Sequence, residues 1–470
     1  DPGVWWQAIC SATRRLVAKG IVPAAEIAAV SVTSQWSGTV AVDSAGDAIG
    51  NAVIWMDSRG APHIRELIGG PVRIEGYDPR KLRQWVRLTG GAPSRSGKDP
   101  LAHILYLRSD HPDVYRRAAT FLEPKDYINL RMTGSAAASF DSIALHWVTD
   151  NTAPTAVVYS DALLELAGLD RSQLPPLRAA TDILGPLRSA AAADLGLAEG
   201  TPVVMGTPDL HSAAIGAGTT PDFAGHLYLG TSSWLVCHVP FKKTDVIHNI
   251  GSLPAAIPGR YLAANAQETA GKAVEWLADI LYPEADNRAE VYSDMNRVAA
   301  DVPAGSRGVI FTPWLYGERT PVEDASLRGG FFNQSLETGR AEMIRAVFEG
   351  VAHNSRWLLH YVEKFVGNRL DPLVLVGGGA QSDLWCQIHA DVLGRRVLQA
   401  EDPIQVNVRG AGLLAHVAVG NLAWDDVPGL VPIEATYEPN PANRKVYDHA
   451  YDAFRQLHKQ NRRTYRRLNS

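Results

Sequence analysis

Residues 373–382 have the sequence LVLVGGGAQS, and this stretch decides the fold prediction. Its first four residues are apolar and favour β-structure, which predicts a buried strand. The three glycines that follow permit a tight turn, and a helix is predicted to begin near Ser382. A strand, a glycine-rich turn and a helix in this order indicate an α/β fold. At such a turn a flat ligand or a phosphate can lie against the backbone.

The three glycines also fit two different structures. They could form a tight connection that only requires positive φ angles, or they could form the dinucleotide-binding loop of an oxidoreductase. The oxidoreductase loop is disfavoured, because the spacing is not G-x-G-x-x-G. In addition, no acidic residue follows a second strand at the distance that ribose binding requires.

The same alternation of strands and helices extends over the rest of the chain. A length of 470 residues exceeds what one hydrophobic core usually serves, so two domains are expected. The pattern starts afresh after Thr219-Thr220-Pro221, which predicts one lobe at 1–219 and a second, duplicated α/β lobe at 220–470. Strands are predicted at 29–33, 39–43, 51–55, 202–206, 226–229, 234–239 and 373–376, and helices at 4–19, across 61–130 with a break at 89–100, at 212–218, 268–300 and 340–365.

Composition excludes several classes of protein. The net charge of -5 is spread along the chain, and the basic cluster at 462–467 is interrupted by Tyr465, which is typical of a solvated helix face and not of a nucleic-acid tail. No apolar run is long enough to span a membrane. The cysteines Cys10, Cys237 and Cys386 are far apart and lack zinc-site spacing. They favour a reducing, cytoplasmic location.

Asp209 is the candidate catalytic base. It follows the predicted strand 202–206 in the sequence Gly-Thr-Pro-Asp-Leu-His, at the strand end where α/β sheets bind ligands. A carboxylate there can accept the proton of an attacking hydroxyl during phosphoryl transfer. Asp209 could instead cap the following helix. A metal pair with His211 is a third interpretation, but no further His or Asp cluster lies near in sequence, so no metal ligand is assigned.

Two other segments have the composition of ligand-binding turns. Residues 229–233, Leu-Gly-Thr-Ser-Ser, are small and polar between two predicted strands, so their N–H and hydroxyl groups can surround a phosphate, although an ordinary hairpin has the same composition. Gln35 and Trp36 lie on an earlier inter-strand turn, and Trp55 and Asp57 close the next strand. Amide, indole and carboxylate groups of this kind can bind a polyol. Core packing of the tryptophans and a salt bridge between Asp57 and Arg59 are the alternatives.

The order of these segments resembles the FGGY carbohydrate kinases, in particular their xylulokinase-like branch. The likeness extends from Asp1 to about Leu414. Gly-Glu-Arg-Thr-Pro at 317–321 and the segment 377–385 are its most specific parts. The matching stretches are 55–59, 123–127, 206–209, 229–233, 316–321, 345–351 and 376–385.

The resemblance implies two actin-like, RNase H-like ATPase lobes with the active site in the cleft between them. It implies ATP and Mg²⁺ as cofactors and a small-molecule sugar as substrate, with no nucleic acid or membrane partner. Asp209 is then expected to be the base, and a homodimer is a reasonable expectation for a soluble enzyme. The residues expected at the sugar are Gln35, Trp36, Trp55 and Asp57, and those expected at the nucleotide are Gly230, Thr231, Ser232, Gly378, Gly379, Ala380 and Gln381.

This sequence departs from the family pattern at three places. Family members open with a strand, an Asp-x-Gly-Thr turn and a second strand before the segment that starts this chain. We expect either that an upstream part is missing from this sequence or that the protein has lost part of its catalytic apparatus, and that the first sheet has an unpaired edge or a gap. Trp36-Ser37 stands where xylulokinases usually carry Met-His. Residues 405–412 lack an acidic residue that is often found there.

Two functions follow from the sequence. The first is ATP-dependent phosphorylation of a sugar or polyol hydroxyl, with a ketopentose such as xylulose as the expected substrate. The alternative is a catalytically impaired relative that binds sugar or nucleotide, and it is motivated by the absent hairpin.

Overall fold

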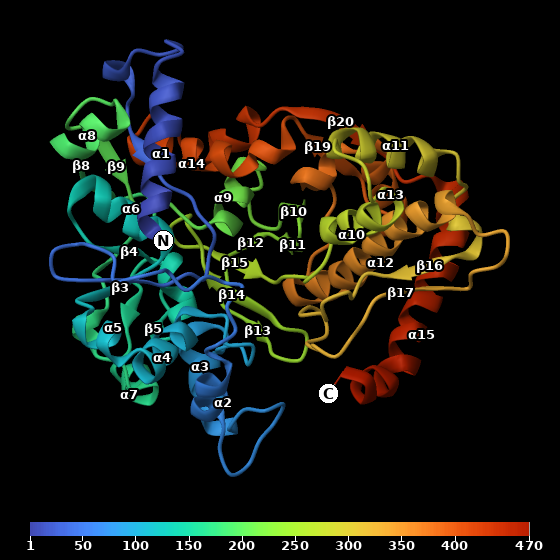
Figure 1. The fold of residues 1–470 in the computed structure, drawn as a ribbon, viewed down its shortest axis with the longest axis horizontal. Coiled ribbons are helices and arrows are strands. Elements are labelled where there is room, and N and C mark those ends of the chain that lie inside the picture. The colour runs from blue at the N-terminus through green and yellow to red at the C-terminus, as the bar shows by residue number, and fades with distance from the viewer. Residues whose placement is uncertain (470) are drawn as a thin grey trace.

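The computed structural model describes residues 1–469, which fold into two α/β lobes (Figure 1). We propose a boundary near residue 220, between α9 and β10. The first lobe contains the helices α1 (Pro2–Val17), α2 (Ala61–Ile68), α3 (Pro79–Thr89), α4 (Pro100–Asp110), α5 (Pro112–Arg117), α6 (Pro124–Thr133), α7 (Asp161–Ala167), α8 (Ser189–Leu195) and α9 (Asp209–Gly216). Its strands are β1 (Val30–Ser31), β2 (Val40–Val42), β3 (Thr120–Leu122), β4 (Ala138–Ser139), β5 (Thr149–Asp150), β6 (Val158–Tyr159), β7 (Leu177–Arg178), β8 (Ile183–Pro186) and β9 (Pro202–Val204).

The strands of the first lobe form several small sheets. One has the order β1-β9-β8, in which β1 runs parallel to β9, and another pairs β2 with β3. β1 and β2 are therefore edge strands of different sheets. The strand predicted at 51–55 was wrong, since only Val53 pairs, in an isolated bridge with Thr39. The Asp57 N–H donates to the Ile54 carbonyl at 2.8 Å, and this turn ends the pairing.

The largest sheet of the second lobe is mixed and has the order β11-β10-β18-β19-β20, and two smaller sheets have the orders β12-β15-β14-β13 and β16-β17. β10, β18 and β19 run parallel, and the outer strands β11 and β20 are antiparallel to their neighbours. Its strands are β10 (Gly225–Leu229), β11 (Ser233–Val236), β12 (His238–Val239), β13 (Thr244–Asp245), β14 (Ile250–Pro254), β15 (Tyr261–Ala264), β16 (Ile310–Thr312), β17 (Gly330–Phe332), β18 (Leu373–Val376), β19 (Val397–Ala400) and β20 (Ile433–Tyr437). Its helices are α10 (Gly271–Leu281), α11 (Arg288–Ala300), α12 (Arg340–Val366), α13 (Asp383–Leu393), α14 (Val406–Ala418) and α15 (Arg444–Asn469).

The packing of β18 on both faces explains why its sequence is apolar throughout. Leu373 and Leu375 pack with residues of α12 and α13, whereas Val374 and Val376 pack with residues of α9 and α14. Successive side chains of a strand point to opposite faces, so a strand covered on both faces has no polar position. The four residues predicted as a strand are the four observed.

The helices α9 and α14 join the two lobes. They cross so closely that a Cβ atom on Gly216 would lie 1.8 Å from the Val406 carbonyl oxygen, and one on Gly410 would lie 1.9 Å from the Ser212 carbonyl oxygen. The Ser212 hydroxyl also donates to the Asn407 carbonyl at 2.8 Å. The crossing therefore depends on two glycines, one from each lobe.

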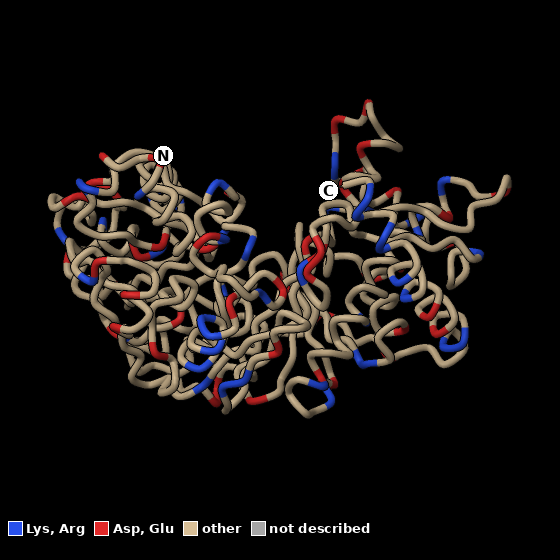
Figure 2. The backbone as a smooth tube through the Cα atoms, turned by 90° about the horizontal axis from the view of Figure 1, so that it is seen from below, with Lys and Arg blue, Asp and Glu red and all other residues tan. Residues whose placement is uncertain are grey.

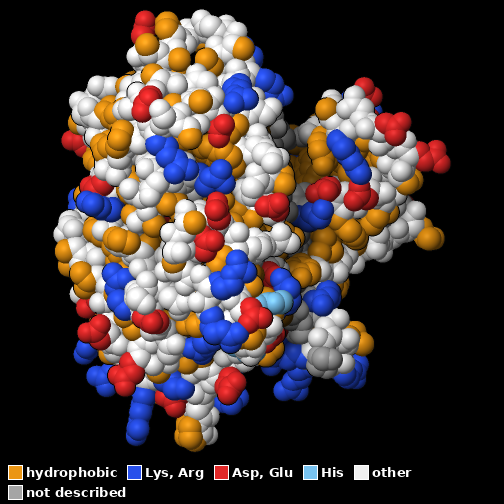
Figure 3. All heavy atoms as spheres, turned by 60° about the vertical axis from the view of Figure 1, so that its left-hand side comes forward, with side chains coloured by type: hydrophobic (Ala, Val, Ile, Leu, Met, Phe, Trp, Pro, Cys, Tyr) orange, Lys and Arg blue, Asp and Glu red, His pale blue; other side chains and the backbone are white. Residues whose placement is uncertain are grey.

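The outline of the molecule is bilobed. The backbone forms two masses that are joined in the middle and separated at one side, with acidic and basic residues interspersed over both (Figure 2). In the space-filling view a deep notch separates the larger mass from the smaller one (Figure 3). Among residues 1–469, no helix combines the length and the apolar composition needed to cross a membrane.

Candidate active site

Asp209 is the first residue of α9 and is partly buried. The chain turns into α9 at Gly206, whose φ is +69° and whose Cβ would lie 2.2 Å from the Val32 carbonyl oxygen. The Asp209 carboxylate accepts the N–H of Leu210 at 2.8 Å and is also bonded by the backbone N–H of Trp36. Burial outweighs these bonds and raises the pKa of Asp209 to about 6. A carboxylate that titrates near neutrality suits a general base.

A helix cap and a metal ligand, the two alternative roles for Asp209, find less support. The N-cap position of α9 is Pro208, and no side chain caps this helix. The His211 ring faces Trp36, at 4.9 Å between ring centroids, and its Nε2 lies 3.1 Å from the Pro254 carbonyl oxygen. Within residues 1–469 no three His, Cys, Asp or Glu side chains come together as a metal site would require.

A buried polar cluster supports the turn before Asp209. Lys125 forms an ion pair with Asp126, both fully buried, and its Nζ donates to the Met205 carbonyl at 3.2 Å. The Asn129 amide donates to the same carbonyl at 2.8 Å. Glu123 accepts the Gly38 N–H at 2.8 Å, and its pKa lies well above its usual value, chiefly because of burial. Glu123, Lys125 and Asp126 belong to the segment 123–127, which the sequence marked only through its resemblance to the family.

The residues expected to contact sugar fall into two groups. Gln35 and Trp36 lie beside Asp209. The Trp36 side chain is buried in the core of the first lobe, and its indole donates to the Ser142 carbonyl at 3.1 Å, so the core packing that the sequence allowed for this tryptophan is present. Trp55 and Asp57 lie on the turn that follows Val53. Asp57 is held by Arg59, with Nε 2.9 Å from Oδ2, and this bond lowers its pKa. The salt bridge that the sequence allowed between Asp57 and Arg59 is therefore present.

The phosphate-binding turn expected at 230–232 is a hairpin between β10 and β11. The Gly230 N–H donates to the Ser232 carbonyl at 3.0 Å, and Thr231 is exposed. The start of α10 packs against this turn, because the Ala270 N–H donates to the Thr231 carbonyl at 2.9 Å and the Gly271 N–H to the Gly230 carbonyl at 2.7 Å. The hairpin is thus held from behind while its tip stays accessible.

Tyr228 connects the hairpin with the candidate base. It stacks on Trp234 at 4.0 Å between centroids, and a Cβ on Gly230 would lie 2.4 Å from the Tyr228 ring. Burial, together with the negative charge of Asp209, raises the pKa of the Tyr228 phenol. Ala213 of α9, one turn after Asp209, belongs to the hydrophobic cluster against which Tyr228 and Trp234 pack, so the helix that begins at Asp209 lies near the strands that flank the hairpin.

The glycine-rich turn after β18 adjoins the same hairpin. Gly377 has a φ of +88°, and its Cβ would lie 2.8 Å from the Leu229 carbonyl oxygen, just before the hairpin. Gly378 has open space where a side chain would be, and Gln381 is exposed, whereas a Cβ on Gly379 would meet the Trp385 ring at 2.6 Å. Ala380 is fully buried, so its side chain faces the core. The backbone at Gly378 is thus free of surrounding side chains, and a flat ligand could approach it.

Four charged residues near the hairpin were not identified as site residues from the sequence. Glu268 forms ion pairs with two cations. Its Oε1 lies 2.9 Å from Arg319 Nε and 3.8 Å from Nζ of Lys98, which belongs to the first lobe. The Glu268 N–H donates to Glu318 at 2.9 Å, and burial raises the pKa of Glu318 to about 7. Glu318 and Arg319 belong to the Gly-Glu-Arg-Thr-Pro motif, and that motif is the signal that could have located them.

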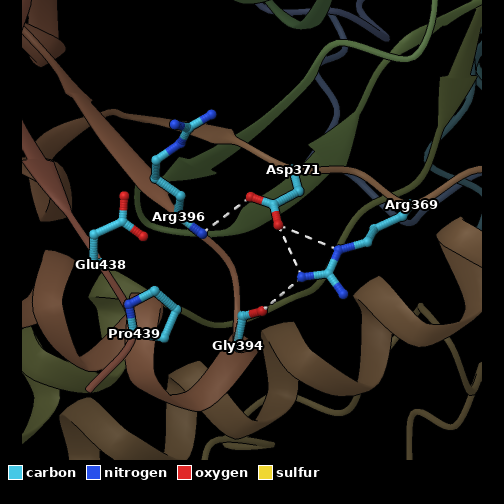
Figure 4. Close-up of a pocket in the computed structure, with 6 residues that line it drawn as sticks. All are labelled: Arg369, Asp371, Gly394, Arg396, Glu438 and Pro439. Carbon is cyan, nitrogen blue, oxygen red and sulfur yellow. Dashed lines mark hydrogen bonds and ion pairs between the residues drawn. The ribbon is translucent and has the colours of Figure 1, made fainter. Parts of the chain in front are cut away.

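A separate pocket of about 390 Å³ lies on the second lobe, near the N-terminal ends of β18 and β19 (Figure 4). Ligands of α/β sheets bind at the opposite, carboxyl ends of the strands. Its polar groups also bond to one another, as Arg369 donates to Asp371 at 2.8 Å and the Arg396 N–H donates to Asp371 at 3.2 Å. We therefore assign it no part in the reaction. It is lined by Arg369, Asp371, Gly394, Arg396, Glu438 and Pro439.

Comparison with protein families identifies both lobes. Residues 1–216 match the N-terminal domain of the FGGY family of carbohydrate kinases, and residues 226–419 match its C-terminal domain. The chain belongs to the FGGY family. It is therefore a carbohydrate kinase with the two-domain FGGY fold.

Individual FGGY kinases resemble this chain over nearly its whole length. A xylulose kinase of Staphylococcus epidermidis is 26% identical over 98% of this chain and 88% of its own length. An autoinducer-2 kinase of Klebsiella pneumoniae is 29% identical over 94% of this chain and 82% of its own. The ligand-bound xylulose kinase of Lactobacillus acidophilus superposes with a TM-score of 0.85 at 23% identity, covering 100% of this chain and 91% of that one. Kinases of this family use ATP.

Proposed function

We propose that this FGGY kinase transfers the terminal phosphate of ATP to a hydroxyl of a ketopentose such as xylulose, with Asp209 as the general base. The observation that carries the proposal is the packing of α9, which begins at Asp209, near Tyr228 and Trp234, the residues that flank the 230–232 hairpin. Phosphoryl transfer needs the attacking hydroxyl and the transferred phosphate to be held in line within one site that excludes water. A base on one lobe and a phosphate-binding turn on the other meet this need when the lobes close.

The remaining residues bind and orient. We assign Gln35, Trp36, Trp55 and Asp57 to the sugar, where Gln35 offers its amide and the buried Trp36 ring supports the segment that carries Gln35. Gly230, Thr231 and Ser232 would hold phosphate through N–H and hydroxyl groups, and the turn of Gly378, Gly379, Ala380 and Gln381 would lie along the adenosine. The proton of the sugar hydroxyl would pass to the Asp209 carboxylate.

Mg²⁺, when bound with ATP, neutralises phosphate charge. The chain offers no dedicated carboxylate cage within residues 1–469. At nucleotide sites Mg²⁺ usually binds through one or two carboxylates together with phosphates and water.

Autoinducer-2 is the second candidate substrate. It is favoured by the relatives named autoinducer-2 kinase, which reach 29% identity over 94% of the chain, slightly more than the xylulose kinase does. Trp36-Ser37 in place of Met-His also separates this chain from the xylulokinase pattern at the sugar. A screen of ketoses, polyols and autoinducer-2 with an ATP-consumption readout decides between them. If the protein phosphorylates none of these compounds, the proposed function is wrong.

The three free and buried cysteines, Cys10, Cys237 and Cys386, support the proposal that the enzyme works in the cytoplasm.

The raised pKa of Asp209 predicts an acidic limb in the pH profile. The base must be ionised to accept a proton, so kcat/KM should fall as the pH drops through about 6. At pH values below this pKa, log kcat/KM should fall by one unit for each unit by which the pH is lowered. A plot of kcat/KM between pH 4.5 and 8.5 tests this. A limb near pH 4 would mean that the essential carboxylate is not Asp209.

A further inference from the structure

Lys98 reaches from the sugar-binding side of the first lobe to the second lobe. Its backbone carbonyl accepts the hydroxyl of Ser37 at 2.7 Å, and Ser37 directly follows Trp36. Its Nζ lies 3.8 Å from Glu268 Oε1, and only 16% of the Lys98 side chain and 12% of the Glu268 side chain are exposed. The pair is therefore shielded from bulk solvent, where screening would weaken it.

Glu268 is attached to the phosphate-binding hairpin. Gln267, its neighbour, exchanges two backbone hydrogen bonds with Ser233, at 2.7 and 3.2 Å, at the base of the hairpin. Two residues further on, the Ala270 N–H donates to the Thr231 carbonyl at 2.9 Å. A displacement of the hairpin is thus transmitted to Glu268 through short backbone contacts on both sides.

The charges around Glu268 are not balanced in pairs. Arg319 Nε lies 2.9 Å from the same carboxylate oxygen that Lys98 approaches at 3.8 Å, so two cations share one anion. Lys98 also lies over the Tyr316 ring, 5.4 Å from its centroid. Arg95 and Glu323 form a second pair between the lobes, at 3.7 Å, and Glu318 bonds to the backbone N–H groups of Glu268 and Arg319. The Lys98–Glu268 contact is long, and closure of the lobes can shorten it.

We infer that the Lys98–Glu268 pair couples sugar binding to nucleotide binding, with Lys98 as a positioning residue. This inference rests on the proposed kinase function. A sugar seated beside Trp36 fixes the Ser37 segment and with it Lys98, while a nucleotide seated on the hairpin fixes Glu268. The ion pair gains its full strength only when both partners are in place, so each ligand should increase the affinity for the other.

Equilibrium binding tests the coupling directly. The dissociation constant of the β,γ-imido analogue of ATP is measured by calorimetry, with and without a saturating amount of the sugar that the screen identifies. In the unmodified protein we expect the sugar to lower the dissociation constant of the analogue about tenfold. In Lys98→Met and in Glu268→Gln, the factor by which sugar lowers the dissociation constant should fall to about two or less. The double variant should show the same reduced factor as either single variant.

Two further measurements separate coupling from simple damage. Arg95→Met removes the cation of the Arg95–Glu323 pair, which comes from the same loop as Lys98 and also joins the two lobes. This variant should retain the tenfold effect of sugar on nucleotide binding. Lys98→Arg keeps the charge and should restore most of it.

The possible outcomes distinguish the inference from the function on which it rests. If the unmodified protein phosphorylates a sugar but shows no coupling, or if Lys98→Met keeps the full factor, the inference is wrong and the kinase function stands. An equal loss in Arg95→Met would also overturn it, because any bridging charge would then suffice. If the unmodified protein phosphorylates no sugar, both fall together.

Discussion

Replacing Asp209 with asparagine should lower kcat by about a thousandfold and leave the fold intact. The amide has nearly the shape of the carboxylate, and its oxygen can still accept the N–H groups of Leu210 and Trp36. It cannot accept the proton of the sugar hydroxyl, so the transfer step loses its base. Steady-state turnover with the identified sugar, with KM determined separately, measures the effect, and most of it should appear in kcat.

The stability of this variant provides an internal check. Folding raises the pKa of Asp209 above its unfolded value, so the folded state prefers the protonated carboxyl. That preference is fully present below the unfolded pKa, and it is lost as the pH rises through about 6. At pH 8 the ionised carboxylate opposes folding, so Asp209→Asn should not lower the melting temperature.

A matched control is available in Asp161, which also stands at the first position of a helix but is exposed. Asp161→Asn should keep turnover within about twofold. Retention of more than a tenth of the normal kcat by Asp209→Asn would remove Asp209 from the role of base.

Local sequence patterns predicted most of the helices and the strand β18, because they reflect local physical constraints, but they did not predict the strands β3–β8, β13–β17, β19 and β20. Residues 373–376 were predicted as a strand and form β18 without a change of boundary, since burial on both faces leaves only apolar positions. The strand predicted at 51–55 failed for an equally local reason. Its β-favouring residues are present, but the turn that bonds Asp57 to Ile54 ends the ladder after one bridge. Propensity alone does not register such a competing hydrogen bond.

The candidate site could be predicted only where one segment carries its own signal. Asp209 at a strand end and the Gly-Thr-Ser turn are of this kind. The Lys98–Glu268 contact is not, because it joins residues 170 positions apart in the sequence and forms only through the packing of two lobes. The same limit applies to Ala380, whose small side chain could belong either to a ligand surface or to the core, and which lies in the core.

The crossing of α9 and α14 should be the most sensitive point of the architecture. Gly410→Ala places a methyl group where the Ser212 carbonyl oxygen lies 1.9 Å away, and helix backbone on both sides prevents an easy shift. We expect a loss of about 3 kcal/mol in the free energy of unfolding, at the upper end of what overpacking costs. The melting temperature should fall by on the order of 5 °C. Because α9 begins at Asp209, turnover should fall as well.

Gly412, two residues further along α14, separates packing from helix propensity. A Cβ there meets nothing within 4 Å, so Gly412→Ala adds the same methyl group to the same helix without a clash. Alanine is better than glycine within a helix by about 0.5–1 kcal/mol, so this variant should be slightly more stable than the natural sequence. If the two substitutions change the free energy of unfolding in opposite directions, as measured by thermal unfolding, the loss of stability in Gly410→Ala arises at the contact between the lobes. If Gly410→Ala instead behaved like Gly412→Ala, the two helices could not cross as closely as Gly216 and Gly410 place them, and Asp209 would lose the support that aims it at the hairpin.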